Sequence, residues 1–487
     1  MHSLDQLKLS NTYSNLPEVF YSRVTPAAFA QPKLASINHQ AAALLDLNLN
    51  MHTDQEIAEY FCGAKYFQNS SPVASVYAGH QFGVYVHQLG DGRALILGDI
   101  KNQQGETWEI QLKGSGITPY SRHADGRAVL RSSIREYLCS EAMFGLGIPT
   151  TRALALVVGD EKVYREEMET AAMVTRLAPT HIRFGTFEYF HHRMEIEQVK
   201  SLADHLLTNH FQALLDTEKP YAQLFQAIVS STATLIAQWQ TVGFAHGVMN
   251  TDNMSVLGLT LDYGPFAFLD SYQSGFICNH SDYNGRYAFN KQPAIGLWNL
   301  NALAHGFSSL VEKDNLISAL KSYEDTFLNT FETRMAEKLG FSVQNNGDSA
   351  LLLELLTLME QNQVDYTLFF RQLSYFKRKD KNTELRDLFI NRDAFDHWAD
   401  KYQQRLDIEQ SKEPQRQEKM LHSNPKFVLR NYIAEEIISA AKENQNFKPL
   451  NDFLAVLHSP FEEHPDFEHY AGIPPEWSKE IAISCSS

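Results

Sequence analysis

Phosphate chemistry is suggested by five features that follow one another along the chain. A Gly90-Asp91-Gly92 turn comes first, and Lys113, Glu136, Asn253 and Asp262 follow it. The transition state of phosphate transfer spreads negative charge over several oxygens, so fixed cations and a divalent metal in a dry cleft stabilise it. Amide and carboxylate oxygens suit Mg²⁺ or Mn²⁺ rather than zinc. The set predicts a cleft for a phosphate compound and a divalent cation.

The same order of parts occurs in protein kinases. There a glycine loop covers the phosphates, a strand Lys pairs with a helix Glu, and an Asn and an Asp hold the metal. Each feature alone has an ordinary explanation, because a Gly-x-Gly turn is usually a hairpin and a strand Lys is usually solvated. The prediction of a nucleotide-binding cleft depends on the ordered set.

The segment from His246 to Asn253 departs from the kinase pattern at one position. The interval of seven residues from His246 to Asn253 matches the kinase pattern H-R-D-L-x-x-x-N. Val248, however, stands where kinases have the Asp that accepts a proton. Asp252 is the only carboxylate in this segment. Asp262-Tyr263-Gly264 stands where the kinase Asp-Phe-Gly triplet would be. The missing base weighs against ordinary kinase chemistry.

A tight hairpin is expected over Met254–Leu261, with its turn at Leu257-Gly258. This register pairs residue 253 with residue 262, and directly paired residues have Cβ atoms about 5 Å apart on one face. Asn253 and Asp262 should then converge on one cation, although a slip of one residue would separate them. The alternative is a plain hairpin with an Asx-turn at its mouth.

The elements that must carry these residues begin with a β-rich stretch over residues 73–115. Gly-rich turns separate four short strands, which predicts an antiparallel meander. The strands are expected at Val73–Tyr77, Val84–Gln88, Ala94–Leu97 and Trp108–Lys113. In the last of them Trp108, Ile110 and Leu112 alternate with polar residues, so one face is buried and Lys113 points to the other.

A helix is expected at about Arg131–Phe144, with Glu136 off its apolar face and directed to water or into a cleft. Two further strands are expected, at Ala153–Val158 and Ala171–Leu177. Apolar stripes at 3–4 spacing predict helices in residues 196–245 and beyond about residue 295. This order indicates an α+β fold, with a β-rich N-terminal lobe and a largely helical C-terminal lobe.

The composition is that of an ordinary globular protein of 487 residues, 44% hydrophobic and 21% charged. Lys and Arg total 42 against 58 Asp and Glu, and the formal net charge of -16 repels phosphate backbones and anionic lipid. We therefore expect no nucleic-acid and no membrane partner, although a local basic pocket is compatible with this charge. With no secretory signal pattern and only four scattered cysteines, we expect a cytoplasmic protein with reduced thiols and, by default, a monomer.

Five sequence blocks make the chain similar to the SelO/YdiU family. They are YAGHQFGVYVHQLGDGRA, LKGSGITPYSRHADGRAVLRSSIREYL, GIPTTRAL, HGVMNTDNMSVLGLTLDYGPF and NPKFVLRNYIAE. The resemblance extends over nearly the whole chain. It implies a protein-kinase-like two-lobe fold that binds ATP in a flipped orientation and transfers AMP to Ser, Thr or Tyr of proteins. UMP transfer from UTP with Mn²⁺ has also been ascribed to bacterial relatives.

The resemblance also implies roles for individual residues. Nucleotide contacts are implied at Gly90, Gly92, Arg93, Lys113, Asp125, Gly126, Arg176, Arg183 and Asp262. Metal ligation is implied at Asn253 and Asp262. A general-base role is implied at Asp252, and Glu136 is expected to pair with Lys113. The donor is then ATP or UTP, the metal is Mg²⁺ or Mn²⁺, and the partners are proteins with free hydroxyl groups.

AMP transfer requires attack at the α-phosphate, so additional cations should surround the outer phosphates that leave as pyrophosphate. Arg176 and Arg183 are candidates, because guanidinium groups fit phosphate oxygens. Their step of seven suits one helix face, but Pro179 between them favours a loop. Without the resemblance, two surface arginines would be the simpler interpretation.

Cys485, near the C-terminus, belongs to a predicted redox pair. Other members of the family carry a redox-active Cys or selenocysteine there. Bacterial relatives can bridge it to a Cys of the activation-loop region, which in this sequence is Cys278. Such a bridge would lock the loop. The alternative is two free thiols.

We expect four parts of the chain. They are an N-terminal extension that packs on the core (1–70), a β-rich nucleotide-binding lobe (71–180), a catalytic and metal-binding part (181–295) and a helical region with the redox-active tail (296–487). The predicted function is that of a protein adenylyltransferase, a nucleotidyltransferase. A kinase-type phosphotransferase and a non-catalytic, nucleotide-binding pseudokinase scaffold are the alternatives. A scaffold would predict a broken metal site, yet both candidate ligands are present.

Overall fold

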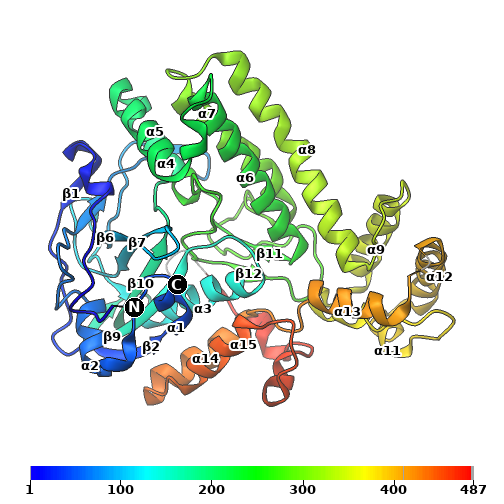
Figure 1. The fold of residues 1–487 in the computed structure, drawn as a ribbon. Helices are drawn as coiled ribbons and strands as arrows, with labels where there is room; N and C mark the ends of the chain where they lie inside the picture. Colours follow the sequence, from blue (N-terminus) through cyan, green and yellow to red (C-terminus); the bar gives the residue numbers. More distant parts are fainter. Residues whose placement is uncertain (1, 410, 484–487) are drawn as a thin grey trace.

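The computed structural model describes residues 2–409 and 411–483 (Figure 1). Eight strands form one antiparallel sheet: β1 Tyr21–Arg23, β2 Lys33–Ile37, β3 Val73–Ser75, β6 Ala94–Lys101, β7 Thr107–Lys113, β8 Ala128–Val129, β9 Arg152–Tyr164 and β10 Met168–Ala178. Their order is β1-β3-β6-β7-β10-β9-β2, and β8 pairs with β10. Both outer strands come from residues 21–37, so the N-terminal segment completes the two edges of the sheet.

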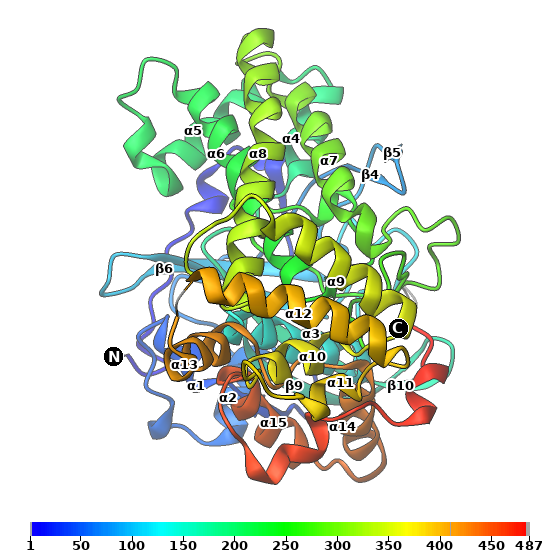
Figure 2. The ribbon, with the colours of Figure 1, turned by 90° about the vertical axis from the view of Figure 1, so that its right-hand side faces the viewer.

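The β4–β5 hairpin leaves this sheet. Strand β4, Gly79–Gln81, pairs only with β5, Val84–Val86, among the described residues. We predicted the second of these segments as part of the meander, and that prediction is wrong. The hairpin instead lies beside the helical part of the chain (Figure 2). Its backbone is held there by the side chain of Thr251, whose Oγ1 accepts from the His80 N–H at 2.7 Å.

Strand β7 is buried on both faces. The predicted alternation is present, but its polar residues Glu109 and Gln111 are buried as completely as its apolar ones. The reason is that other parts of the chain cover the polar face of β7 and exclude water from it. Gln111 stands opposite Arg176 of β10, and Lys113 stands opposite Ala94 of β6. The polar face therefore gathers charged groups beside one another.

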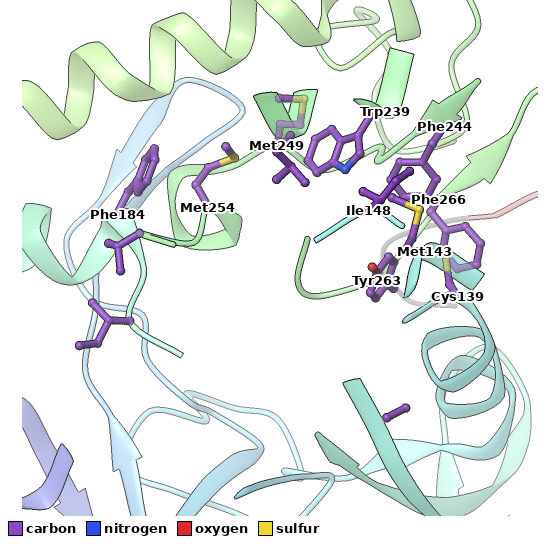
Figure 3. Packing of buried hydrophobic residues seen from close by; sticks show 14 of the residues in the cluster. Cys139, Met143, Ile148, Phe184, Trp239, Phe244, Met249, Met254, Tyr263 and Phe266 are labelled. Carbon is purple, nitrogen blue, oxygen red and sulfur yellow. The ribbon is translucent and has the colours of Figure 1, made fainter. Parts of the chain in front are cut away.

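Helix α3, Leu130–Gly145, is one residue longer at each end than predicted. It packs against β9 and β10, and its Cys139 gathers with Tyr263 and Phe266 in the buried core (Figure 3). Arg135 of the same helix donates to the Phe266 carbonyl at 3.1 Å. The helix is thereby fixed to the segment that follows residue 262.

Helices dominate the chain from residue 184 on; those in residues 196–245 and beyond about residue 295 were predicted, and α4 was not. The first group comprises α4 Phe184–His192, α5 Ile196–His210, α6 Pro220–Thr241, α7 Gln292–Phe307 and α8 Lys313–Lys338. The second group comprises α9 Asp348–Asn362, α10 Tyr366–Leu373, α11 Thr383–Arg386, α12 Arg392–Glu409 and α13 Glu413–Ser423, and with the end of α8 it encloses a separate apolar core. The last two, α14 Asn431–Asn444 and α15 Lys448–His458, pack on α3.

Four short elements complete the fold: α1 His39–Ala43, α2 Asp54–Phe61, β11 Phe244–Ala245 and β12 Ala267–Phe268. Helix α6 lies beside α8, and these two long helices form one flank of the molecule (Figure 1). Within the described ranges, none of the helices combines the length and apolar character that a membrane span needs. The structure thus has the α+β composition that the sequence predicted.

Arg430 ties the C-terminal region to the middle of the chain. Its side chain is 2% exposed, and it donates to Asp270 at 2.8 Å and to Asp365 at 2.9 Å. Asp270 follows strand β12, and Asp365 caps the N-terminus of α10. A single buried guanidinium therefore joins three segments that are distant in sequence.

Arg430→Ala should destabilise the fold by roughly 3 kcal/mol, because it leaves two carboxylates beside each other without their buried cation. The midpoint of urea denaturation measures this loss. Lys479→Ala is the control, since it removes an exposed ion pair with Glu476 and should leave the midpoint nearly unchanged. Equal midpoints for the two variants would contradict the assigned role.

Candidate active site

One cleft of about 710 Å³ holds the residues that the sequence singled out. All predicted nucleotide, metal, base and ion-pair residues line it: Gly90, Gly92, Arg93, Lys113, Asp125, Gly126, Glu136, Arg176, Arg183, Asp252, Asn253 and Asp262. Its lining includes seven Lys or Arg and five Asp or Glu. Basic side chains thus outnumber acidic ones in this cleft, although the whole chain has a net charge of -16.

The carboxylate of Asp262 is the centre of a charge network. Its Oδ1 accepts from Arg176 and lies 3.5 Å from Lys113 Nζ, and its Oδ2 accepts from Arg183. Glu136 contacts Lys113 Nζ and lies 3.1 Å from Arg176. Burial alone would raise the pKa of Asp262, but the three cations hold it well below its ordinary range. Asp262 is therefore ionised and keeps these cations together.

The backbone at Asp262 adopts an uncommon conformation. Its φ is 59°, in the left-handed region that few residues other than Gly occupy, Asn and Asp more often than most. Neighbouring contacts hold it there, because the Tyr263 hydroxyl pairs with Thr150 and the Tyr263 ring is buried in the core (Figure 3). Such strain persists only where the surroundings fix it, and it is frequent at functional sites.

Arg183 reaches Asp262 from the start of α4, where it is the residue before the helix. Its Nη1 also donates to the Asp252 carbonyl at 2.7 Å. Its guanidinium lies over the ring of Tyr77, 4.8 Å from the centroid. Arg183 thus links the segment of residue 252 to that of residue 262, and Tyr77 restricts its rotation.

Arg176 reaches the same carboxylate from β10. Its Nε donates to Gln111 Oε1 at 3.0 Å, across the β7–β10 pair. Strand β10 ends at Ala178, between the two arginines, and α4 begins at Phe184, directly after Arg183. The interval between the two arginines is therefore a strand end followed by a turn, as Pro179 predicted, and not one helix face.

The predicted hairpin over Met254–Leu261 is wrong. Ser255 pairs with Arg183, and Thr260 pairs with Thr150. Both sides of this segment make backbone hydrogen bonds to other parts of the chain, and a single turn, in which the Gly258 N–H donates to the Ser255 carbonyl at 3.2 Å, joins them. Residues 253 and 262 still line the same cleft, but neighbouring segments and not a hairpin register bring them there.

Asp252 lies in a single 3₁₀ turn, Thr251–Asn253. Its Oδ2 accepts from Gln81 Nε2 of the β4–β5 hairpin at 3.2 Å. Its Oδ1 is buried and has no hydrogen-bond partner among the described residues. Burial raises the pKa of Asp252 to about 6. A carboxylate with one unpaired oxygen and a pKa near neutrality is suited to accept a proton from a hydroxyl group.

Asn253 offers an amide oxygen to the cleft residues. Its Nδ2 donates to the Val248 carbonyl at 3.1 Å, which leaves Oδ1 as the acceptor atom of this amide. No group of three or more His, Cys, Asp and Glu forms a metal site in the part of the chain that the structure describes. Mg²⁺ needs only one or two carboxylates when water and substrate phosphates complete its shell. The oxygens of Asn253 and Asp262 are of the kind that such a cation binds, and both oxygens of Asp262 also accept from arginines.

The Gly90-Asp91-Gly92 turn is packed against Tyr120. The φ of Gly90 is 128°, and a Cβ at this position would lie 2.5 Å from Cγ of Tyr120. Asp91 points inward, where its Oδ2 accepts from the Ser75 N–H at 3.1 Å. The turn is therefore a fixed part of the cleft wall. A Gly-x-Gly pattern gives no sign that its middle residue is buried.

Asp125, Gly126 and Arg93 lie at the rim of the cleft, where Arg93 is exposed. Arg165, which the sequence did not single out, binds both oxygens of Asp125 at 2.6 and 2.9 Å. The φ of Gly126 is 73°, and a Cβ there would lie 2.1 Å from the carbonyl carbon of Gly116. Only glycine therefore fits at residue 126.

Glu109 fixes the turn between the two arginines, and sequence reasoning missed it. Its carboxyl group accepts from the His181 N–H and from Nδ1 of the same residue, both at 2.8 Å, and from the Thr180 hydroxyl at 3.0 Å. Burial raises the pKa of Glu109 to about 8 and lowers that of His181 to about 3. The strand pattern placed Glu109 on the polar face of β7, but nothing local in the sequence shows that a distant turn covers it.

Cys278 is buried, and its Sγ lies 2.7 Å from the Pro265 carbonyl oxygen. Cys485 lies outside the described residues, so its pairing with Cys278 stays a prediction. The backbone N–H of His280 donates to the Ile483 carbonyl at 2.9 Å. The end of the described chain thus passes beside the segment that carries Cys278.

The groups gathered in the cleft define a class of enzyme. One cleft holds a glycine turn, a strand Lys paired with a helix Glu, two further buried arginines and the amide and carboxylate of Asn253 and Asp262. This is the equipment of an enzyme that transfers part of a nucleoside triphosphate.

Known proteins identify the family. A sequence model described as "Protein adenylyltransferase SelO" matches residues 3–458. The protein nucleotidyltransferase YdiU of Myxococcus xanthus (strain DK1622) is 51% identical over 489 residues, which cover 100% of both chains. The protein of the same description from Aliivibrio fischeri (strain ATCC 700601 / ES114) is 50% identical over 483 residues and 99% of both chains. The chain belongs to the SelO family, and it is a nucleotidyltransferase.

Activity should depend on pH through Asp252. Burial raises the pKa of this carboxyl group to about 6, so below that pH it is protonated and cannot accept a proton. The kcat for label transfer from ATP should therefore fall about tenfold for each pH unit below the pKa and level off above it. Asp252→Asn should remove this pH dependence together with most of the activity. A kcat that is unchanged on acidification to well below the pKa would contradict the base role.

Glu109→Ala should raise the KM for ATP roughly tenfold with a smaller change in kcat, because the turn that carries Arg183 loses its buried acceptor. Glu109→Gln keeps an oxygen acceptor and should retain most of the affinity. Steady-state kinetics of both variants test this positioning role. Equal losses in the two variants, or a loss confined to kcat, would refute it.

Proposed function

We propose that this chain transfers AMP from ATP to Ser, Thr or Tyr hydroxyl groups of proteins. The observation that carries the proposal is the charge network of the cleft, in which Lys113, Arg176 and Arg183 converge on the Asp262 carboxylate. The kinase pattern supplies a single strand Lys, whereas this cleft holds three fixed cations. They can neutralise the negative charge of a departing pyrophosphate. The family description and the names of the relatives support the same activity.

A protein-kinase-like fold with ATP in a flipped orientation is part of this proposal. The sheet with α3 supplies the Lys113–Glu136 pair, and the helical part supplies the segment of residues 246–262. In the proposed orientation the β- and γ-phosphates lie beside Arg176 and Arg183, and the α-phosphorus faces the acceptor. The rim residues Asp125 and Gly126, with the neighbouring Arg93, would contact the outer end of the nucleotide.

The reaction is a displacement at the α-phosphorus. The acceptor oxygen forms a bond to this phosphorus, the bond to the bridging oxygen of pyrophosphate breaks, and the hydroxyl proton passes to Oδ1 of Asp252. Lys113 and the two arginines neutralise the charge that develops on the leaving pyrophosphate. A divalent cation, Mg²⁺ or Mn²⁺, would be held by Asn253 and Asp262 and would supply further charge neutralisation. Both oxygens of Asp262 also bind arginines, so phosphate and Asp262 compete for the same guanidinium groups.

Further parts of the proposal concern the setting of the enzyme. We propose that the chain has four parts, with boundaries after residues 70, 180 and 295. We also propose that the enzyme acts as a monomer in the cytoplasm and that it accepts UTP as a second donor. The net charge of -16 supports the absence of nucleic-acid partners. The redox pair of Cys278 with Cys485 is proposed for the tail.

A kinase-type transfer of the γ-phosphate is the second candidate, and the Lys113–Glu136 pair fits it equally well. Val248 is evidence against γ-phosphate transfer, because this cleft-lining residue occupies the position of the kinase base and cannot accept a proton. The carboxylate that can act as base, Asp252, lies four residues further along the chain. The choice between the two depends on which phosphorus the acceptor attacks.

Incubation with ATP labelled at the α- or at the γ-phosphate separates the functions. Label on protein from the α-position alone is expected, and label from the γ-position alone would establish a kinase.

Asp252→Ala should lower the transfer rate about 10²–10⁴-fold, the usual value of general-base help. Asp262→Asn should abolish transfer, since a cation ligand and the anchor of three cations are lost together. Transfer at the wild-type rate by both variants would overturn the site assignment, and thermal unfolding curves check that they fold.

A further inference from the structure

A second hollow lies next to the nucleotide cleft. It has a volume of about 540 Å³ and is lined by the hairpin tip, the loop before α7 and the first turn of α7: Phe82, Ser281, Asp282, Tyr283, Asn284, Arg286, Lys291 and Ile295. Phe82 lines both the hollow and the nucleotide cleft. The two spaces thus share one lining residue, and none of the proposed nucleotide or metal residues lines the second.

Hydrogen bonds join the wall of this hollow to the candidate base. The Phe82 N–H donates to Tyr287 Oη at 2.9 Å and to Asn250 Oδ1 at 3.2 Å. The Tyr287 hydroxyl donates to Asn250 at 2.6 Å. Gln81, the residue before Phe82, donates to Asp252. The hollow therefore has a fixed position relative to Asp252, as a substrate-positioning surface requires.

The charge of the hollow is positive. Arg286 and Lys291 line it, and neither takes part in an ion pair within the described residues. Arg286 is held in place, since its guanidinium lies 4.7 Å from the centroid of Trp298, and its buried Nε has no hydrogen-bond partner among the described residues. The acidic lining residue, Asp282, is directed to the backbone, where it accepts from the N–H groups of Arg286 at 2.9 Å and Tyr287 at 2.7 Å. In a chain of net charge -16, this local excess of cations favours an anionic ligand.

Exposed aromatic groups accompany these cations. The side chain of Tyr283 is 92% exposed, and that of Phe82 is 39% exposed. Large aromatic side chains are among the commonest anchors of protein interfaces, since they bury much area at little entropic cost. A hollow with two exposed aromatic rings and two unpaired cations suits a polypeptide better than a small anion.

We propose that this hollow binds the acceptor protein, through an extended segment that has an acidic residue close to the modified hydroxyl. The proposal rests on the proposed AMP transfer and names its substrate class. The acidic side chain lies by Arg286 and Lys291, the backbone passes Tyr283 and Phe82, and the hydroxyl enters the cleft beside Asp252. The shared wall residue Phe82 sets the path from one space to the other.

A charge swap tests the proposal. The acceptors are two short peptides, each with a single serine, flanked by glutamates in one and by lysines in the other. The wild-type enzyme should modify the acidic peptide with the lower KM. Lys291→Glu should raise the KM for the acidic peptide roughly three- to tenfold and lower it for the basic one, with the affinity for ATP unchanged. The difference should shrink as salt is added, because exposed charges are screened.

Two further variants sharpen the result. Tyr283→Ala should raise the KM for both peptides, since it removes a contact that does not depend on charge. Lys381→Glu, at an exposed lysine that lines neither space, is the matched control and should behave as wild type. Self-modification with α-labelled ATP shows in the same experiment that the enzyme is active.

The outcomes are distinct. If AMP is transferred but Lys291→Glu leaves the ratio of the two KM values unchanged, the hollow is not the acceptor site. The same holds if wild type shows no preference between the peptides. If α-label reaches neither peptide nor the enzyme itself, the proposed AMP transfer fails, and the acceptor site fails with it.

Discussion

The ionised Asp262 carboxylate is the constraint on which the rest of the structure depends. It is the common counter-ion of Lys113, Arg176 and Arg183, which would otherwise be three like charges in a buried space. Removing such charges from water costs several kcal/mol each unless they are paired. Because the cations come from β7, β10 and the start of α4, one carboxylate fixes the sheet relative to the helical part. The left-handed backbone at Asp262 is the conformational cost of placing it there.

A second layer of buried polar groups keeps this centre in position. Gln111 orients Arg176, and Glu109 holds the turn that leads to Arg183. Tyr77 covers the guanidinium of Arg183. None of these groups needs to touch a substrate, but each restricts the motion of one that does. Preorganisation of this kind is what makes charge stabilisation effective in an active site.

The sequence predicted the order of elements and the membership of the cleft. The strand pattern of β7, the apolar stripe of α3 and the helical periodicities beyond residue 196 are local signals, and the structure contains all of these elements. The hairpin over Met254–Leu261 was predicted from local pattern as well, but it failed. Its two sides instead pair with distant partners, Arg183 and Thr150. Local periodicity cannot reveal competition of this kind.

The buried polar residues were missed for a related reason. Glu109 and Asp91 occupy positions that are normally solvated, and their burial depends on segments many residues away. The clustering of Arg176 and Arg183 on one carboxylate is likewise a product of topology, since a strand end and a helix start must meet. The family resemblance named these arginines without explaining them, and the fold supplies the explanation.

The edges of the sheet have a consequence for synthesis of the chain. Strand β2 is made early, but its partner β9 spans Arg152–Tyr164, and the central strand β10 ends only at Ala178. Most of the sheet therefore cannot assemble until more than a third of the protein has left the ribosome. Pairings so distant in sequence form slowly and leave apolar strands uncovered in the meantime. The nascent N-terminal half is the stage at which this protein depends most on protection from aggregation.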